Sequence, residues 1–241
     1  MPREDIVYLA DQAHVPYGNR DEADLVRLAA ANVASLEAVG VDAIVMGCNT
    51  SCAIAAKFGW PRSSVQILDL IDAAAGDVAA REPTRIGVIA TAATTATGAY
   101  GNAIRARLPR AVVQEIAAPA LVPLVEAGVV RGPVARDAVR AALVPLVGPV
   151  DTVVLACTHY PLLAEHFSEA LPGVTLVDPA VAQAVRTVAL VRSRTGPDAG
   201  RGYTRYLTTG DEASYRYALV DTFAILRPGD EVARVAHAVR S

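Results

Sequence analysis

The sequence predicts an α/β protein of two pseudo-symmetric lobes, each a mainly parallel sheet flanked by helices, with an active site in the cleft between the lobes. Two observations lead to this prediction. Apolar, strand-like runs alternate with helical stretches along the chain, an order that is typical of parallel sheets covered by helices. Residues 41–50 and 150–159 also align with four identities in ten positions, at an offset of 109 residues (157 − 48), which indicates a duplicated half-domain.

Eight apolar runs are predicted as strands. They are rich in Val and Ile and lack regular polar alternation, as is usual for strands that are buried on both faces. In chain order these runs are residues 5–10, 42–47, 64–68, 85–90, 111–117, 151–156, 174–177 and 204–209.

Helical stretches lie between the strands. Residues 20–40 have acidic side chains in the first turn and Gly40 at the end, the pattern of a capped helix. Residues 132–148 and 178–196 each carry Pro at an early helical position. From these elements we expect a first lobe of residues 1–82 plus 179–241 and a second lobe of residues 83–178.

Composition excludes several classes of protein. The net charge is −3 and the pI is about 5.8, with no run of Lys or Arg, so the chain lacks the basic footprint of a nucleic-acid-binding protein. No apolar run approaches the roughly 20 residues of a membrane span. The start, MPREDIVYLAD, is acidic and lacks the cleavage site of a secretory signal. We therefore expect a cytoplasmic protein with reduced thiols.

The three cysteines are too few for a disulfide framework. A zinc site built from Cys48, Cys52 and His159 is the alternative use of thiols, but the sequence has no CxxC or HxxxH spacing, so we expect no metal. We expect Cys52, within a helical stretch, to be a small buried hydrophobic residue.

Cys48 and Cys157 each follow a predicted strand, where open parallel sheets bind their ligands. Lowering a thiol pKa by two units needs about 2.7 kcal/mol, whereas a helix N-terminus contributes about 0.3–1 kcal/mol. A thiolate therefore needs a further polar neighbour. His159 is the candidate for Cys157, but Thr50 stands at the matching position for Cys48.

Two thiols on opposite sides of one cleft suit proton exchange at a stereocentre. One thiolate removes a proton from one face of the carbon, and the opposite thiol returns a proton to the other face. The chain has no GxGxxG after its first strand and no GxxxxGK[ST], so we expect no cofactor.

Six stretches carry a resemblance to a known family. The chain resembles glutamate racemases of the aspartate/glutamate racemase superfamily across nearly its whole length, and CNT and CTHYPL together are specific. The stretches are DIVYLADQAHVPYG (5–18), VMGCNTSCA (45–53), RIGVIATAATTATGAY (85–100), ALVPLVEAG (120–128), VVLACTHYPLL (153–163) and TTGDEASY (208–215).

The resemblance implies a cofactor-independent racemase that supplies D-glutamate for peptidoglycan. Cys48 would work on D-glutamate and Cys157 on L-glutamate, with His159 assisting Cys157. Asp11 and Glu126 match acidic residues that have supporting roles in the family. The substrate-binding residues that the resemblance implies are Tyr17, Gly18, Asn49, Thr50, Thr94, Thr158 and His159.

Purely structural roles remain as alternatives for several of these residues. Asp11 and Glu126 could be solvated or capping carboxylates, and Tyr17 could serve packing. We assign no function to His14 and His166 and expect them at the surface.

The sequence departs from the family pattern at its start. Family members open with a strand and a glycine-rich turn with an Asp-Ser pair, and this sequence shows neither. We expect that Met1 is an internal position and that roughly 20–25 residues, one strand and one helix, precede it. A second departure is ILDLIDAAAG at 67–76, where the family usually has a proline-containing segment.

Two alternatives to a glutamate racemase remain open. One is an amino-acid racemase of another specificity, such as aspartate. The other is a catalytically degenerate, racemase-like binding protein, which the missing Asp-Ser pair favours. For the oligomeric state we keep a homodimer open.

Overall fold

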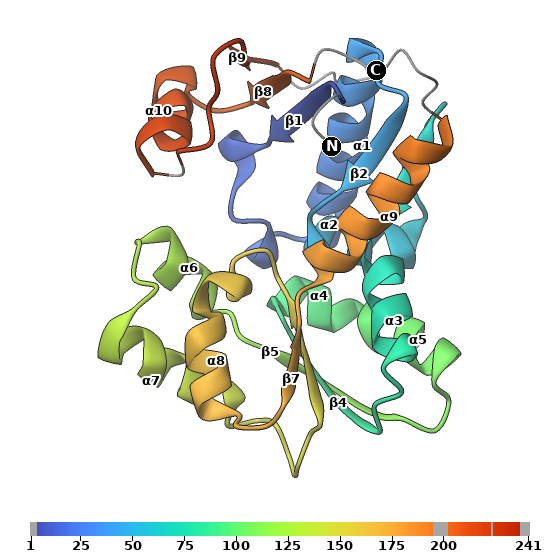
Figure 1. The fold of residues 1–241 in the computed structure, drawn as a ribbon, viewed down its shortest axis with the longest axis vertical. Coiled ribbons are helices and arrows are strands. Elements are labelled where there is room, and N and C mark those ends of the chain that lie inside the picture. The colour runs from blue at the N-terminus through green and yellow to red at the C-terminus, as the bar shows by residue number, and fades with distance from the viewer. Residues whose placement is uncertain (1–3, 195–201, 223, 237–241) are drawn as a thin grey trace.

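The computed structural model describes residues 4–194, 202–222 and 224–236. It shows an α/β protein whose parallel sheets are flanked by helices, which confirms the predicted fold class. In Figure 1, β1, β2, β8 and β9 lie in the upper half of the molecule, and β4, β5 and β7 lie in the lower half. We call these halves lobe one and lobe two. Their predicted residue boundaries stay a prediction.

Lobe two is built on one four-stranded sheet with the order β5-β4-β6-β7, in which all neighbouring strands are parallel. Its strands are β4 (Arg85–Ala90), β5 (Val112–Ala117), β6 (Thr152–Ala156) and β7 (Thr175–Val177). Its helices are α4 (Ala92–Thr97), α5 (Ala99–Arg107), α6 (Leu121–Glu126), α7 (Gly132–Leu143) and α8 (Ala164–Ala170), and a 3-10 turn spans Tyr160–Leu163.

The strands of lobe one fall into two parallel sheets, β1-β8-β9 and β2-β3. These strands are β1 (Ile6–Ala10), β2 (Ala43–Met46), β3 (Gln66–Asp69), β8 (Thr204–Thr208) and β9 (Glu231–Arg234). The helices are α1 (Glu22–Val39), α2 (Asn49–Phe58), α3 (Leu70–Ala80), α9 (Pro179–Arg194) and α10 (Glu212–Tyr217). All eight predicted strands are present, and β9 was not predicted because its sequence, EVAR, is short and polar.

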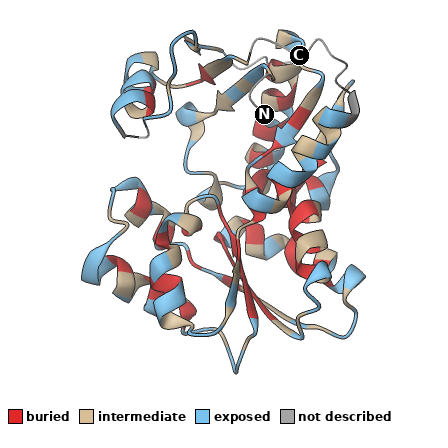
Figure 2. Ribbon diagram, in the orientation of Figure 1, coloured by how far each residue is buried: buried red, intermediate tan, exposed pale blue. Residues whose placement is uncertain are grey.

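The central strands of lobe two divide the core into two layers. Successive side chains of a strand point to opposite faces, so Ile86 and Val88 join one apolar cluster and Ile89 joins another with α6–α8. The first cluster also contains Ile44 of β2 and Cys52 of α2, so one apolar core runs through both lobes. Figure 2 shows buried residues on the strands of lobe two and on the helices where the lobes meet.

The predicted helix ends agree with the structure in one case and differ in another. In α1 the side chain of Asp21 accepts a hydrogen bond from the Asp24 backbone, and Gly40 ends the helix at φ 86°, which suits glycine. The helix predicted over 132–148 ends at Leu143. Pro145 lacks the backbone N–H that would continue the helical hydrogen bonds, so the helix does not extend through it. Among the described helices, none is long and apolar enough to cross a membrane.

Candidate active site

Cys48 lies in the short connection between β2 and α2. It is the residue before the first helical residue, in an extended conformation (φ −96°, ψ 119°), and its side chain makes no capping hydrogen bond. The side chain is half-buried. Because β2 ends at Met46, the thiol sits at the carboxyl edge of its sheet, where a ligand can approach the backbone donors that begin α2.

Cys157 follows β6 in the same way and is 6% exposed. Its Sγ lies 3.7 Å from Nδ1 of His159. The other ring nitrogen of His159, Nε2, lies 2.5 Å from Oε1 of Glu126 at the end of α6. The structure therefore brings three of the predicted residues into one chain of contacts that runs from thiol to imidazole to carboxylate.

The electrostatics of Cys157 work against a resting thiolate. Burial raises the pKa of its thiol to about 12, and a negative charge on Cys48 adds to the rise. The backbone N–H groups of His159 and Tyr160 act in the opposite direction. Cys157 is therefore protonated at neutral pH, and the two thiols lie close enough to influence each other's ionisation.

A second polar cluster surrounds Asp11, directly after β1. Its carboxylate accepts hydrogen bonds from Nδ1 of His14 at 2.7 Å, from Oγ1 of Thr209 at 2.6 Å, and from the Tyr17 hydroxyl. Tyr17 in turn accepts a hydrogen bond from Nδ2 of Asn32 at 2.9 Å. The Asp11 carboxylate is thus held by three donors, and the Tyr17 hydroxyl is held between Asp11 and Asn32.

Tyr17 lies within electrostatic range of Cys48. Burial and the hydrogen bond to Asp11 raise the pKa of the Tyr17 hydroxyl above its usual value, and the charge of Cys48 adds a smaller rise. The charge of Cys48 therefore acts on the Tyr17 side of the Asp11 cluster. A cavity of about 310 Å³ adjoins the same cluster and is lined by His14, Thr209 and Arg234.

Three buried threonine hydroxyls join the lobes. Oγ1 of Thr50 in α2 lies 3.2 Å from those of both Thr91 and Thr94, which are themselves 3.0 Å apart at the start of α4. Gly18 packs against Thr91 of this threonine cluster, since a Cβ added to Gly18 would lie 2.9 Å from Cβ of Thr91. The glycine therefore permits a close approach of lobe one to lobe two.

The remaining predicted binding residues lie next to the two cysteines. Asn49 is 4% exposed and follows Cys48 as the first residue of α2. Thr158 is exposed and follows Cys157, with its Oγ1 3.4 Å from Nδ1 of His159. The structure thus gathers the predicted residues around two thiols. Thr91, Asn32 and Thr209 are neighbours that sequence reasoning did not identify as part of the site.

Cys52 and His166 lie outside the site. Cys52 is fully buried, its Sγ donates to the carbonyl of Met46, and burial followed by the charge of Asp69 raises its thiol pKa. The expectation that His166 lies at the surface is wrong. It is 6% exposed, because α8 packs on α7 and β7 with this side of the helix inward.

Metal ligation has no clear location in the described ranges. Within them, no group of three or more His, Cys, Asp or Glu side chains is arranged to hold a metal ion. Cys52, which the zinc alternative requires, instead directs its sulfur to a backbone carbonyl.

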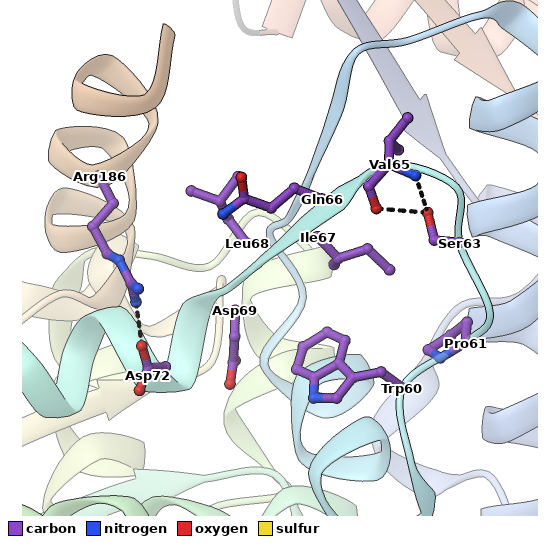
Figure 3. A pocket seen from close by; sticks show the side chains of 10 residues that line it. All are labelled: Trp60, Pro61, Ser63, Val65, Gln66, Ile67, Leu68, Asp69, Asp72 and Arg186. Atoms are coloured by element: carbon purple, nitrogen blue, oxygen red, sulfur yellow. Dashed lines mark hydrogen bonds and ion pairs between the residues drawn. The ribbon is translucent and has the colours of Figure 1, made fainter. Parts of the chain in front are cut away.

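A separate cavity of about 440 Å³ runs along β3 (Figure 3). Trp60 and Pro61 lie on one side of it, and Asp72 and Arg186 form an ion pair of 2.5 Å on the other. Its lining includes Ile67–Asp69, part of the segment that departs from the family pattern, but neither Cys48 nor Cys157. This cavity is therefore distinct from the cysteine site.

Comparison with known proteins gives several relatives. Residues 2–187 match the family described as Asp/Glu/hydantoin racemase. A glutamate racemase of Gloeobacter violaceus is 40% identical over 224 residues, which make up 90% of this chain and 82% of that protein.

Two solved structures are similar over nearly the whole chain. The structure of glutamate racemase isoform RacE1 from Bacillus anthracis matches with a TM-score of 0.86 and 26% identity, and the match covers 99% of this chain and 90% of that one. The structure of glutamate racemase from Francisella tularensis in complex with D-glutamate matches with a TM-score of 0.86 and 25% identity over 100% of this chain and 90% of that one.

Proposed function

Because this chain belongs to the Asp/Glu/hydantoin racemase family, we propose that it interconverts L- and D-glutamate by moving the α-proton between two cysteine side chains. The observation that carries the proposal is that two thiols, one at a strand end of each lobe, lie within electrostatic range of each other. Such a pair can serve both faces of one carbon atom.

The Cys157 side works as follows. His159 takes the thiol proton on Nδ1, and Glu126 stabilises the resulting imidazolium through Nε2. The thiolate of Cys157 then removes the α-proton of L-glutamate. A base of high pKa suits this step, because the α-proton of an amino acid is only weakly acidic.

The Cys48 side completes the reaction. As the Cα–H bond breaks, its electron pair delocalises into the carboxylate. The thiol of Cys48 then gives its proton to the opposite face, which yields D-glutamate and leaves Cys48 as the thiolate. In the reverse direction the thiolate of Cys48 removes the α-proton of D-glutamate, and the thiol of Cys157 protonates the opposite face. His159 then returns its proton to Cys157, so the site needs no external oxidant, reductant or cofactor.

Polar residues around the thiols hold the substrate. A carboxylate requires hydrogen-bond donors, and the hydroxyls of Thr50, Thr94 and Thr158 and the amide of Asn49 supply them. Tyr17, held by Asp11, and Gly18 complete the wall beside Cys48. Asp11 acts here by orienting Tyr17, since its carboxylate already accepts three hydrogen bonds.

The cellular setting is part of the same proposal. The resemblance carried by CNT and CTHYPL supports a cytoplasmic enzyme that supplies D-glutamate for peptidoglycan. The proposed oligomeric state is a homodimer, and light scattering on the purified chain tests it.

The test is chiral analysis after incubation with L-glutamate and, separately, L-aspartate in D2O without added cofactor. We expect D-glutamate that carries deuterium at the α-carbon, and no effect of a chelator. Conversion of aspartate alone would contradict the substrate. Loss of activity with chelator and its return with zinc would contradict the two-thiol mechanism. Binding of glutamate without turnover would favour a degenerate racemase.

A further inference from the structure

Tyr100 is a buried residue of lobe two that meets lobe one beside the first thiol. It lies in α5, is fully buried, and its hydroxyl donates a hydrogen bond to Oδ1 of Asn49. Asn49 directly follows Cys48 and opens α2. This hydrogen bond therefore connects the lobe that carries Cys157 to the residue next to Cys48.

The hydrogen bond fixes which end of the Asn49 amide is left for a ligand. With Oδ1 engaged by Tyr100, the amide NH2 group keeps its two donors for other partners. A carboxylate accepts from NH2 and is repelled by the amide oxygen. The two ends of the amide thus have opposite effects on carboxylate binding, and a rotation of the amide by 180° would exchange them.

We propose that Tyr100 is the positioning residue that holds the Asn49 amide with its NH2 group toward the α-carboxylate of the substrate. This inference rests on the proposed glutamate racemisation and adds to it a residue outside the predicted site. Tyr100 packs in the apolar cluster that runs through both lobes, together with Cys52 and Ile104, so its ring has little freedom to move. Burial keeps the pKa of its hydroxyl well above the usual value, so the hydroxyl retains its proton and remains a donor.

The position of Tyr100 matters because the α-carbon has to sit between two sulfur atoms from different lobes. A carboxylate bound by Asn49 is attached to lobe one through α2 and to lobe two through Tyr100. The hydrogen bond thereby fixes the position of the substrate α-carbon relative to the sulfur atoms of Cys48 and Cys157.

The experiment is a double-mutant cycle of Tyr100→Phe and Asn49→Ala, with kcat and KM measured for both enantiomers. Tyr100→Phe should raise KM about tenfold for L- and D-glutamate alike, because the two share the α-carboxylate, and should change kcat by less than about threefold. The double variant should match Asn49→Ala alone, since Tyr100 acts through Asn49.

Tyr215→Phe is the control. Tyr215 is buried, no described residue bonds its hydroxyl, and its loss should leave KM unchanged within about twofold.

The outcomes separate the inference from the proposed function. Wild-type KM in Tyr100→Phe, or additive effects in the cycle, would overturn the positioning role while racemisation stands. An inactive wild-type chain would overturn the proposed function instead. Should Tyr100→Phe fail to fold, Asn49→Asp gives a second measurement, because it keeps the acceptor for Tyr100 but loses the donors. It should fold and lose glutamate binding, and unchanged binding would contradict the inference.

Discussion

Glu126 holds the ring of His159 from the side away from the thiol, with Oε1 2.5 Å from Nε2. A proton on Nε2 that is donated to this carboxylate leaves Nδ1 free to accept from Cys157, 3.7 Å away. The pair thus selects the tautomer that a general base requires, and it links a half-exposed carboxylate to a buried thiol that does not ionise readily by itself.

Substituting Glu126→Gln should reduce kcat/KM about tenfold. A hydrogen bond to a charged group is worth about 1.5–3 kcal/mol, and the lower end applies because the Glu126 side chain is 59% exposed. L- and D-glutamate have equal free energies in water, so kcat/KM has to fall equally in both directions.

Circular-dichroism assays in both directions measure the effect of Glu126→Gln. Glu169→Gln is the matched control, because Glu169 contacts a histidine, His166, in α8 outside the site. It should change kcat/KM by less than about twofold. A wild-type rate for Glu126→Gln would show that the imidazole works without its carboxylate.

The cysteine variants test the two-thiol mechanism. Cys48→Ala and Cys157→Ala should each lower racemisation more than about 10³-fold, because one removes the proton and the other returns it. Cys52→Ala should keep most of the activity, since its thiol is buried and bonded to a backbone carbonyl. Chiral chromatography measures all three variants, and near wild-type turnover by Cys157→Ala would rule out its assigned role.

The sequence could predict the strands and the residues that directly follow them. Val- and Ile-rich runs identified eight strands, and parallel topology brings their carboxyl ends to one edge, which made Asn49, Thr50 and Thr158 candidates. Repetition of the pattern after 109 residues (157 − 48) distinguished Cys48 and Cys157 from an ordinary buried thiol such as Cys52.

The partners of these residues could not be predicted, because they are remote in sequence. Tyr100 reaches Asn49 across 51 positions, Asn32 reaches Tyr17 across 15, and Thr209 reaches Asp11 across 198. Their side chains are common polar types on ordinary helices and strand ends. Packing of lobe against lobe brings Tyr100 to Asn49, and the pairing of β8 with β1 brings Thr209 to Asp11. Asn32 meets Tyr17 because α1 runs back past the turn at Tyr17–Asn19.

The close contact between Gly18 and Thr91 predicts that Gly18→Ala impairs the site. The added Cβ would lie 2.9 Å from Cβ of Thr91, so the lobes have to shift apart at the threonine cluster. We expect kcat/KM to fall about 10- to 100-fold, as misplacement of about 1 Å can produce.

Gly76→Ala is the control for Gly18→Ala. Gly76 lies in α3 with nothing within 4 Å of its added Cβ, so alanine should preserve activity and raise stability by about 0.5–1 kcal/mol. Steady-state kinetics and thermal unfolding distinguish the two variants. Full activity in Gly18→Ala would mean that the lobes tolerate a wider spacing at this point.

The raised pKa of Cys157 predicts a loss of stability at high pH. Burial raises the pKa of this thiol to about 12 in the folded chain, whereas an unfolded cysteine has a pKa of about 8.5. A group whose folded pKa is raised contributes its full stabilisation below the unfolded pKa and loses it as pH rises toward the folded pKa. The unfolding free energy should therefore fall by about 2.5 kcal/mol between about pH 8 and pH 10.5 on account of this thiol. Cys157→Ser cannot ionise in this range, so its unfolding free energy, measured by urea titration, should fall less than that of the wild type by this amount. Parallel pH profiles for the two proteins would show that the thiol ionises alike in the folded and unfolded chains.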